Sequence, residues 1–244
     1  MAIEQNWFAA TKRTLTATDI YVVALHLVIA ALVGAWLLHR TLSPMREPVK
    51  PLDPGGTVRS QQLAGQIAFV GDSRVSMLAA TNVAPNSENF GVGGQDLRDL
   101  AVQLKALDLQ GASAIVLESG LDDWWRDRLS NIGPHYATAL AALPTAKPVV
   151  ASAILPVNPD QAWRTFDGRY DLHGIEPALA AANAEIARQC AARAGCVFVP
   201  VPSALLAGPD LNPAYSLDGL HLNPAGDAIW AASLRQVVSR LPKT

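Results

Sequence analysis

The stretch Gln66-Ile67-Ala68-Phe69-Val70-Gly71-Asp72-Ser73-Arg74 decides which fold we expect for this chain. Its first five residues are mostly apolar and include β-branched side chains, which is typical of a buried strand in a parallel sheet. The chain then turns at Gly71, and the composition from Val75 to Ala80 predicts the start of a helix. A serine at such a turn lies beside the backbone N–H groups of a helix N-terminus, which can stabilise an oxyanion. Ser73 is therefore a candidate nucleophile.

A second stretch far downstream, Asp218-Gly219-Leu220-His221, offers the groups that a serine nucleophile requires. A hydroxyl is a poor nucleophile until a base takes its proton, and that base must itself be oriented. We therefore expect His221 to act as the base and Asp218 to hold it. Gly-Asp-Ser and Asp-Gly are also common turn sequences, and either one alone favours a structural role. The presence of both, one near each end of a compact domain, favours catalysis.

Strand-like and helix-like segments alternate from Gln66 onward, which predicts a three-layer α/β/α domain with a mostly parallel five-stranded sheet. We expect the strands at residues 66–70, 88–90, 113–117, 148–154 and 196–200. We expect helices at residues 96–107, 136–143, 176–194 and 224–240, and a long connection at 155–174. The stretches that contain Ser73 and His221 then fall at or beyond the carboxyl ends of strands, where open α/β sheets bind ligands.

Four short blocks of this domain resemble the SGNH (GDSL-type) hydrolase family. The first block is Gly71-Asp72-Ser73, and the last is the stretch from Asp218 to His221 followed by Leu222-Asn223-Pro224-Ala225-Gly226. The glycine of the second block matches Gly94. The third block is Gly-x-Asn-Asp in the family and Gly120-Leu121-Asp122-Asp123 here. The resemblance extends over residues 66–241 and implies an SGNH, flavodoxin-like fold that performs serine ester chemistry without a cofactor or metal.

The resemblance also implies a role for each matching residue. Ser73 would be the nucleophile, His221 the base and Asp218 the residue that orients the base. Backbone N–H groups of Ser73 and Gly94 would hold the oxyanion. In the family an asparagine amide adds a third donor, whereas here Asp122 stands in its place, and an ionised aspartate only accepts hydrogen bonds. Loss of one donor typically raises the barrier by ~2.7–4 kcal/mol, which predicts a slow esterase unless Asp122 is protonated.

The first 65 residues precede this domain and have a different character. Residues 1–18 form a polar tail, and Ile20–Leu38 is an uncharged run interrupted only by His26. A helix of this length spans ~28 Å, close to the hydrocarbon thickness of a bilayer. We predict a transmembrane helix at 19–39 and a Pro- and Gly-containing tether at 40–65. A cleaved signal peptide is the alternative, but the run exceeds the usual apolar region of such peptides.

Charge and cysteine content limit the location and the partners. Positive residues flank the apolar run almost equally, so they do not set its orientation, but long domains translocate largely regardless of flanking charge. We therefore expect a single-pass inner-membrane protein with a periplasmic catalytic domain. The net charge of -2, without a Lys/Arg cluster, argues against a nucleic-acid partner. Cys190 and Cys196 either pair as a disulfide outside the cytoplasm or remain buried thiols inside it.

Several aromatic residues are candidates for substrate binding. Trp124 and Trp125 directly follow the third block, and Trp163 lies in the long connection with Phe166 and Tyr170. Aromatic side chains on long loops at a catalytic face often serve function. They can form a stacking wall for a sugar ring or an acyl group, or they can pack beneath the loops. Both interpretations stay open for the tryptophans.

These observations predict a membrane-anchored serine enzyme acting on O-acyl esters, with acetyl esters of a cell-surface polysaccharide as the expected substrate. With water as acceptor it is an esterase, and with a sugar hydroxyl it is an O-acyltransferase. Its layout is similar to that of tethered SGNH proteins of bacterial cellulose and alginate acylation, which implies polysaccharide-synthesis partner proteins. The alternative is a catalytically weak domain that serves as an anchored binding or accessory subunit of an exopolysaccharide complex. Asp122 favours that alternative, and the complete Ser73, Asp218 and His221 set argues against it.

Overall fold

The computed structural model describes residues 21, 23–31, 33–34 and 63–242 of the chain. Contacts divide the chain into two compact units, Met1–Glu47 and Pro48–Thr244. In the first unit the described residues are helical. No helix within the described ranges is both long and apolar enough to cross a membrane. The other residues of the predicted transmembrane segment, the predicted tail and almost all of the predicted tether lie outside the described residues.

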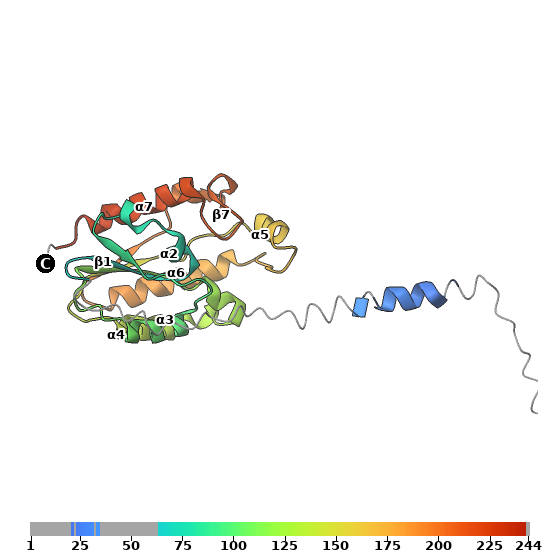
Figure 1. Ribbon diagram of the computed structural model, residues 1–244, viewed down its shortest axis with the longest axis horizontal. Coiled ribbons are helices and arrows are strands. Elements are labelled where there is room, and N and C mark those ends of the chain that lie inside the picture. The colour runs from blue at the N-terminus through green and yellow to red at the C-terminus, as the bar shows by residue number, and fades with distance from the viewer. Residues whose placement is uncertain (1–20, 22, 32, 35–62, 243–244) are drawn as a thin grey trace, which may run out of the picture. The chain divides into compact units, whose positions relative to one another are not determined.

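Five parallel strands form one sheet in the order β2-β1-β3-β4-β5 (Figure 1). The three inner strands β1, β3 and β4 are buried almost throughout, which explains their nearly continuous apolar sequences. The predicted parallel sheet is confirmed, and only the ends of its strands differ. The strands are β1 (Ile67–Gly71), β2 (Ser87–Asn89), β3 (Ala114–Glu118), β4 (Val149–Ser152) and β5 (Cys196–Val199).

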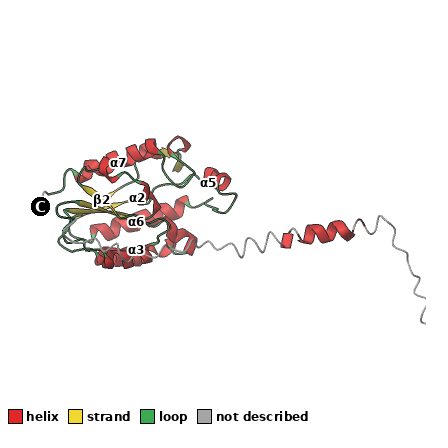
Figure 2. Cartoon of the chain, in the orientation of Figure 1, coloured by secondary structure: helices red, strands yellow, loops and turns green. Residues whose placement is uncertain are grey.

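Helices cover both faces of this sheet and complete the three layers (Figures 1 and 2). Because successive strand residues point to opposite faces, Ala68 and Val70 pack into one core and Phe69 into the other. The first core includes α3 (Leu97–Ala106), α4 (Ile132–Ala142) and α6 (Glu176–Ala191). The second includes α2 (Ser73–Met77) and α7 (Pro224–Val238).

Three local features differ from the sequence-based expectations. The connection at 155–174 contains a helix, α5 (Pro159–Thr165), whose seven residues are too few to show a helical pattern of apolar residues. Helix α4 begins at Ile132 rather than at 136, because a proline is tolerated within the first turn. A small antiparallel hairpin, β6 (Leu206–Ala207) with β7 (Asp210–Leu211), was not predicted because its strands have two residues each.

Short 3-10 helices link several of these elements. One of them, η3, directly follows β3 and carries Asp122 and Asp123. Their bounds are η2 (Ala80–Asn82), η3 (Leu121–Arg126), η4 (Leu129–Asn131), η5 (Ser203–Leu205) and η6 (Pro213–Tyr215).

A disulfide joins Cys190, near the end of α6, to Cys196, at the start of β5. The two Cα atoms are 5.3 Å apart, within the usual range for a bonded pair. Of the two pairing states that the sequence left open, the structure therefore contains the bonded one. The bond fixes the edge strand β5 to the helix that precedes it.

Candidate active site

Ser73 lies at a sharp turn between β1 and α2. A Cβ atom added to Gly71 would lie 1.9 Å from the carbonyl oxygen of Glu118 on the neighbouring strand, so only glycine fits there. The Asp72 side chain caps the helix, because its Oδ1 accepts a hydrogen bond from the backbone N–H of Arg74 at 3.0 Å. Helix α2 consequently begins at Ser73, two residues earlier than expected. Both features direct the Ser73 hydroxyl beyond the carboxyl end of β1.

The structure brings the three predicted catalytic residues together. His221 Nε2 lies 3.0 Å from Ser73 Oγ, and His221 Nδ1 lies 2.7 Å from Asp218 Oδ2. Asp218 Oδ1 accepts backbone N–H bonds from Leu220 and His221, both at 2.8 Å. Burial alone would raise the pKa of Asp218, but the hydrogen bonds from His221 and the backbone outweigh it and lower the pKa. Asp218 is therefore ionised at neutral pH, as a residue that orients a histidine base must be.

The loop of the second block packs against the start of α2. A Cβ atom at Gly91 would lie 2.3 Å from the backbone nitrogen of Ser76, and one at Gly93 would lie 3.8 Å from Ser73 Cβ. Gly94 follows with φ of +73°, a left-handed conformation that glycine adopts at little cost. The loop that carries Gly94 is thus held against the helix that carries Ser73.

Asp122, the second residue of η3, has an unusual charge environment. Burial, followed by the nearby Asp72 carboxylate, raises the pKa of Asp122 to about 7, although the charges of Arg126 and Arg74 oppose this shift. A substantial fraction of Asp122 is therefore protonated near neutral pH, and a protonated carboxyl group can donate a hydrogen bond. The protonated form is the state in which sequence analysis expected Asp122 to contribute to an oxyanion hole.

Residues 68–229 match the GDSL-like lipase/acylhydrolase family. The chain belongs to this family. The predicted membership of the SGNH (GDSL-type) hydrolase family is thereby confirmed. A comparison with curated proteins found no match.

Solved structures of low sequence identity share the fold of this SGNH chain. A candidate platelet activating factor from Streptococcus pneumoniae has a TM-score of 0.64 at 21% identity, over 86% of this chain and 98% of its own. A carbohydrate acetylesterase from Sinorhizobium meliloti has a TM-score of 0.55 at 12% identity, over 73% of this chain and 100% of its own. The catalytic domain of a Streptococcus pneumoniae peptidoglycan O-acetyltransferase has a TM-score of 0.51 at 12% identity, over 72% and 94% of the two chains.

Arg74 connects the SGNH nucleophile helix to two other loops, a role that sequence analysis missed. Its guanidinium group is buried and donates to three backbone carbonyl oxygens. Nη1 and Nη2 bond to Leu155 and Pro156, at 2.5 and 3.1 Å, in the segment that follows β4. Nε bonds to Leu220 at 3.0 Å, directly before His221. One side chain thus holds the Ser73 helix, the His221 loop and the start of the α5 connection together.

Asp72 and Glu118 form a buried pair of carboxyl groups near Ser73, and the sequence did not predict this pair. Glu118 ends β3 within an otherwise apolar strand, and its side chain is completely buried, as is that of Asp72. Burial, followed by the charge of Asp72, raises the pKa of Glu118 well above its usual range. Burial also raises the pKa of Asp72, but the charge of Arg74 opposes this. Of the two carboxyl groups, Glu118 is the one that holds a proton, whereas the charge of Arg74 favours the ionised form of Asp72.

The α5 connection is fixed to the loop that carries His221. The Asn158 backbone N–H donates to the Gly219 carbonyl oxygen at 2.8 Å. A Cβ atom at Gly219, where φ is +96°, would lie 2.3 Å from the backbone nitrogen of Ala162. Only glycine therefore allows α5 to approach this closely to the loop that carries His221.

The candidate aromatic residues occupy two kinds of environment. Trp124 and Trp125 are partly buried against the core, and Trp125 contacts Tyr170 with ring centroids 4.8 Å apart. Tyr170 in turn contacts Phe166 at 4.7 Å, so an aromatic cluster joins η3 to the α5 connection. Trp163 on α5 is 42% exposed. The first two tryptophans thus have a packing role, whereas Trp163 presents a large apolar ring to solvent.

We expect that Arg74→Met destabilises the domain by ~3–5 kcal/mol, because three buried carbonyl oxygens lose a charged donor and Asp72 loses its countercharge. Urea unfolding followed by tryptophan fluorescence measures this change in the free energy of unfolding. Arg188→Met is the matched control, since its ion pair with Glu185 is exposed and should contribute little to stability. Equal unfolding free energies for the two variants would contradict a connecting role for Arg74.

Proposed function

We propose that this protein is a serine esterase or O-acyltransferase that acts on O-acyl esters. The observation that carries the proposal is the continuous hydrogen-bonded set Ser73, His221 and Asp218 at the carboxyl ends of the strands. A base within hydrogen-bond reach of the nucleophile, with a third group orienting it, is the geometry that acyl transfer requires. Membership of the GDSL-like lipase/acylhydrolase family supports the same reaction class.

The reaction would proceed in two steps through an acyl-enzyme. His221 takes the Ser73 proton while Oγ attacks the ester carbonyl carbon, and the oxyanion is held by backbone N–H groups of Ser73 and Gly94. Collapse of this intermediate expels the alcohol, which takes the proton from His221. Water or a sugar hydroxyl then attacks the acyl-enzyme while His221 takes its proton. Collapse of this second intermediate breaks the bond between the acyl group and Ser73 Oγ, which takes the proton back from His221 as the acid or the new ester leaves. Asp218 orients His221 and stabilises its cationic form throughout.

Asp122 would add a third oxyanion donor only in its protonated form. The negative charge that develops on the substrate oxygen favours a nearby carboxyl group over a carboxylate. With a pKa of about 7, Asp122 changes from donor to acceptor within the physiological range. In this proposal the enzyme therefore has a full oxyanion hole at acidic pH and an impaired one at alkaline pH.

For the substrate, we propose an acylated carbohydrate. The backbone at Gly168 packs against the six-membered ring of Trp163, and His173 contacts the same indole with centroids 6.1 Å apart. His173 also bonds to the exposed Asp160 through Nε2 at 3.1 Å. An exposed indole held in place beside polar side chains suits a sugar ring, which has an apolar face and a rim of hydroxyl groups. The similarity in fold to a carbohydrate acetylesterase and a peptidoglycan O-acetyltransferase agrees with this choice.

For the location, we propose a single-pass anchor in the inner membrane through Ile20–Leu38, with the SGNH domain in the periplasm. Two observations support this. Described helical residues of the first unit expose large apolar side chains, including Leu25, Leu27 and Ile29. The Cys190–Cys196 disulfide is typical of oxidising compartments. Proteins of a polysaccharide-synthesis complex would be the partners, and no nucleic acid is involved.

The second candidate function is an anchored binding or accessory subunit of an exopolysaccharide complex. The replacement of the family asparagine by Asp122 favours it, because an ionised aspartate would repel the oxyanion. The hydrogen-bonded Ser73–His221 pair favours the enzyme, because a binding subunit does not need a nucleophile within reach of a base.

The first test is covalent labelling of the full chain by a fluorophosphonate probe. We expect wild-type protein to be labelled at Ser73, because His221 activates the hydroxyl. Ser73→Ala should abolish labelling, and His221→Ala should slow it strongly. Labelling is measured by gel fluorescence and located by peptide mass spectrometry. Equal labelling of wild type and Ser73→Ala would contradict the enzyme proposal.

The second test is Asp122→Asn, which restores a donor that does not depend on pH. Turnover of a small acetyl ester should rise by roughly 10- to 1,000-fold above pH 7. In wild type, kcat should fall as the pH rises through about 7, because Asp122 loses its proton. The variant should lack this fall, because an amide donates a hydrogen bond at every pH. Turnover of Asp122→Asn no higher than that of Ser73→Ala would favour the binding subunit.

The third test concerns orientation in the membrane. Alkaline phosphatase folds only where its disulfides form, so a fusion after Thr244 should be active if the domain is periplasmic. A fluorescent cytosolic reporter at the same site should then be dark. The reverse pattern would place the domain in the cytoplasm.

A further inference from the structure

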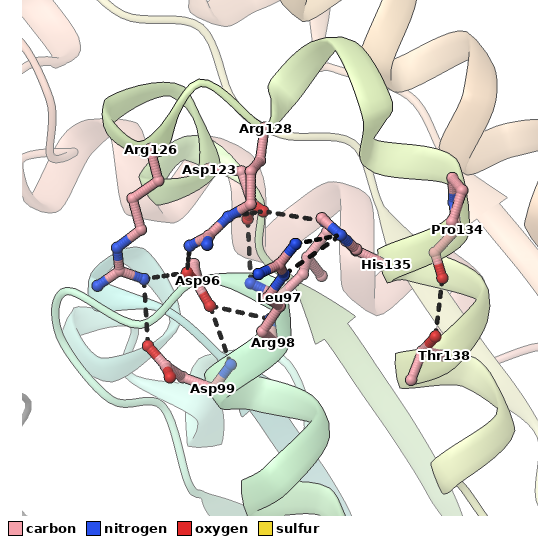
Figure 3. Close-up of polar contacts among 10 residues, drawn as sticks. All are labelled: Asp96, Leu97, Arg98, Asp99, Asp123, Arg126, Arg128, Pro134, His135 and Thr138. Atoms are coloured by element: carbon pink, nitrogen blue, oxygen red, sulfur yellow. Dashed lines mark hydrogen bonds and ion pairs between the residues drawn. The ribbon is translucent and has the colours of Figure 1, made fainter.

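A cluster of ion pairs joins the loop that carries Gly94 to the helix η3 that carries Asp122 (Figure 3). Asp96 Oδ1 caps α3 by accepting the backbone N–H groups of Arg98 and Asp99, both at 2.9 Å. Its other oxygen, Oδ2, pairs with two arginines, Arg126 at the end of η3 and Arg128 just beyond it. Asp96 thus uses one oxygen for its own helix and the other for the neighbouring segment.

A second carboxylate, on η3, connects the same two segments in the opposite direction. Asp123, on η3, accepts the backbone N–H of Leu97 at the start of α3 through Oδ2 at 3.0 Å. Arg128 lies between the two carboxylates, since its Nη2 contacts Asp96 and its Nε is 3.8 Å from Asp123 Oδ1 (Figure 3). Both aspartates are almost completely buried. A buried charge without a partner is strongly destabilising. The arrangement in which these aspartates face Arg128 is therefore much lower in free energy than one in which they are separated from it.

Both ends of the cluster lie next to the proposed oxyanion hole. Gly94 precedes Asp96 by two residues, and Asp122 directly precedes Asp123. Residues so close in sequence to a fixed point have little freedom to move independently of it. A misplacement of about 1 Å in such a site can cost about 100-fold in rate.

We propose that the Asp96–Arg126–Arg128 cluster, called here the inter-loop clamp, sets the distance between the Gly94 N–H group and the side chain of residue 122. Arg126 and Arg128 are then positioning residues for the acyl-transfer transition state and do not touch the substrate. This inference rests on the proposed function, because it assigns the clamp a role in that reaction. Of the two arginines, Arg128 gives the cleaner test, since the charge of Arg126 also acts on the pKa of Asp122.

Two variants break the clamp by different means. Arg128→Ala removes the side chain that lies between the two carboxylates. Asp96→Asn removes the charge but keeps the helix cap, because asparagine caps a helix as well as aspartate does. Arg98→Ala is the matched control, since the Arg98 side chain lies outside the clamp and bonds to His135, at 3.3 Å. Thermal unfolding of each variant shows whether it is folded at the assay temperature.

The test is a double-mutant cycle on a small acetyl ester, with each variant made in the wild-type and in the Asp122→Asn background. We expect Arg128→Ala and Asp96→Asn to lower kcat by ~10- to 100-fold with KM changed less than ~2-fold, because ground-state binding is retained. The rate gain from Asp122→Asn should largely disappear in both, because the restored amide is no longer aligned with Gly94. Arg98→Ala should keep both the activity and the gain. Arg128→Lys, which retains a charge, should recover part of the loss.

The outcomes separate the clamp from the proposed function. If wild type is active but Asp122→Asn gives the same gain with and without the clamp, the clamp does not position the donors and the inference is wrong. An unchanged kcat in Asp96→Asn would have the same meaning. If Arg128→Ala does not fold, the cycle with Asp96→Asn and Arg128→Lys decides. Absence of Ser73-dependent activity in wild type would overturn the proposed function, and this inference with it.

Discussion

The bonds of the Arg74 guanidinium group to three main-chain carbonyl oxygens are the interaction on which the candidate site depends. Ser73 and His221 lie 148 residues apart in sequence, so chain connectivity alone does not bring their side chains together. Arg74 connects their two segments, because it follows Ser73 directly and its Nε donates to the carbonyl oxygen of Leu220, the residue before His221. The ionised Asp72 and the protonated Glu118 allow this charge to be buried at the base of the site. The geometry of the candidate site thus depends on buried charges as much as on the sheet.

The same principle extends to the other half of the site. On one side Arg74 aligns serine with histidine, and on the other the inter-loop clamp aligns the second block with the third. In both cases an arginine spans two loops that leave the same edge of a parallel sheet. A parallel sheet delivers loops to that edge but does not fix how they approach one another. Arginine side chains, with several donors in a rigid plane, fix that approach.

Sequence analysis predicted the parts of the molecule that local patterns encode. The apolar runs that became β1, β3 and β4 and the turn at Gly71 follow from neighbouring residues, and Ser73, Asp218 and His221 each lie in a short local motif. The residues that it missed act over long distances: Arg74 contacts Leu220, and Arg128 contacts Asp96. The burial of Glu118 was not predicted, because a single acidic residue after an apolar run usually marks the exposed end of a strand. Helix α5 was too short to show periodicity. No local pattern distinguishes a buried arginine from an exposed one.

The close approach of α5 to Gly219 also determines how the wall of the site can move. The Asn158–Gly219 hydrogen bond and the lack of room for a Cβ atom join backbone to backbone. Such a junction has no side-chain torsion about which it could open, so α5 and the His221 loop should fluctuate as one rigid body. The wall that carries Trp163 is then not a hinged lid. Exchange of a ligand at this wall would then need no slow opening step, and its rate would be set by diffusion and surface affinity.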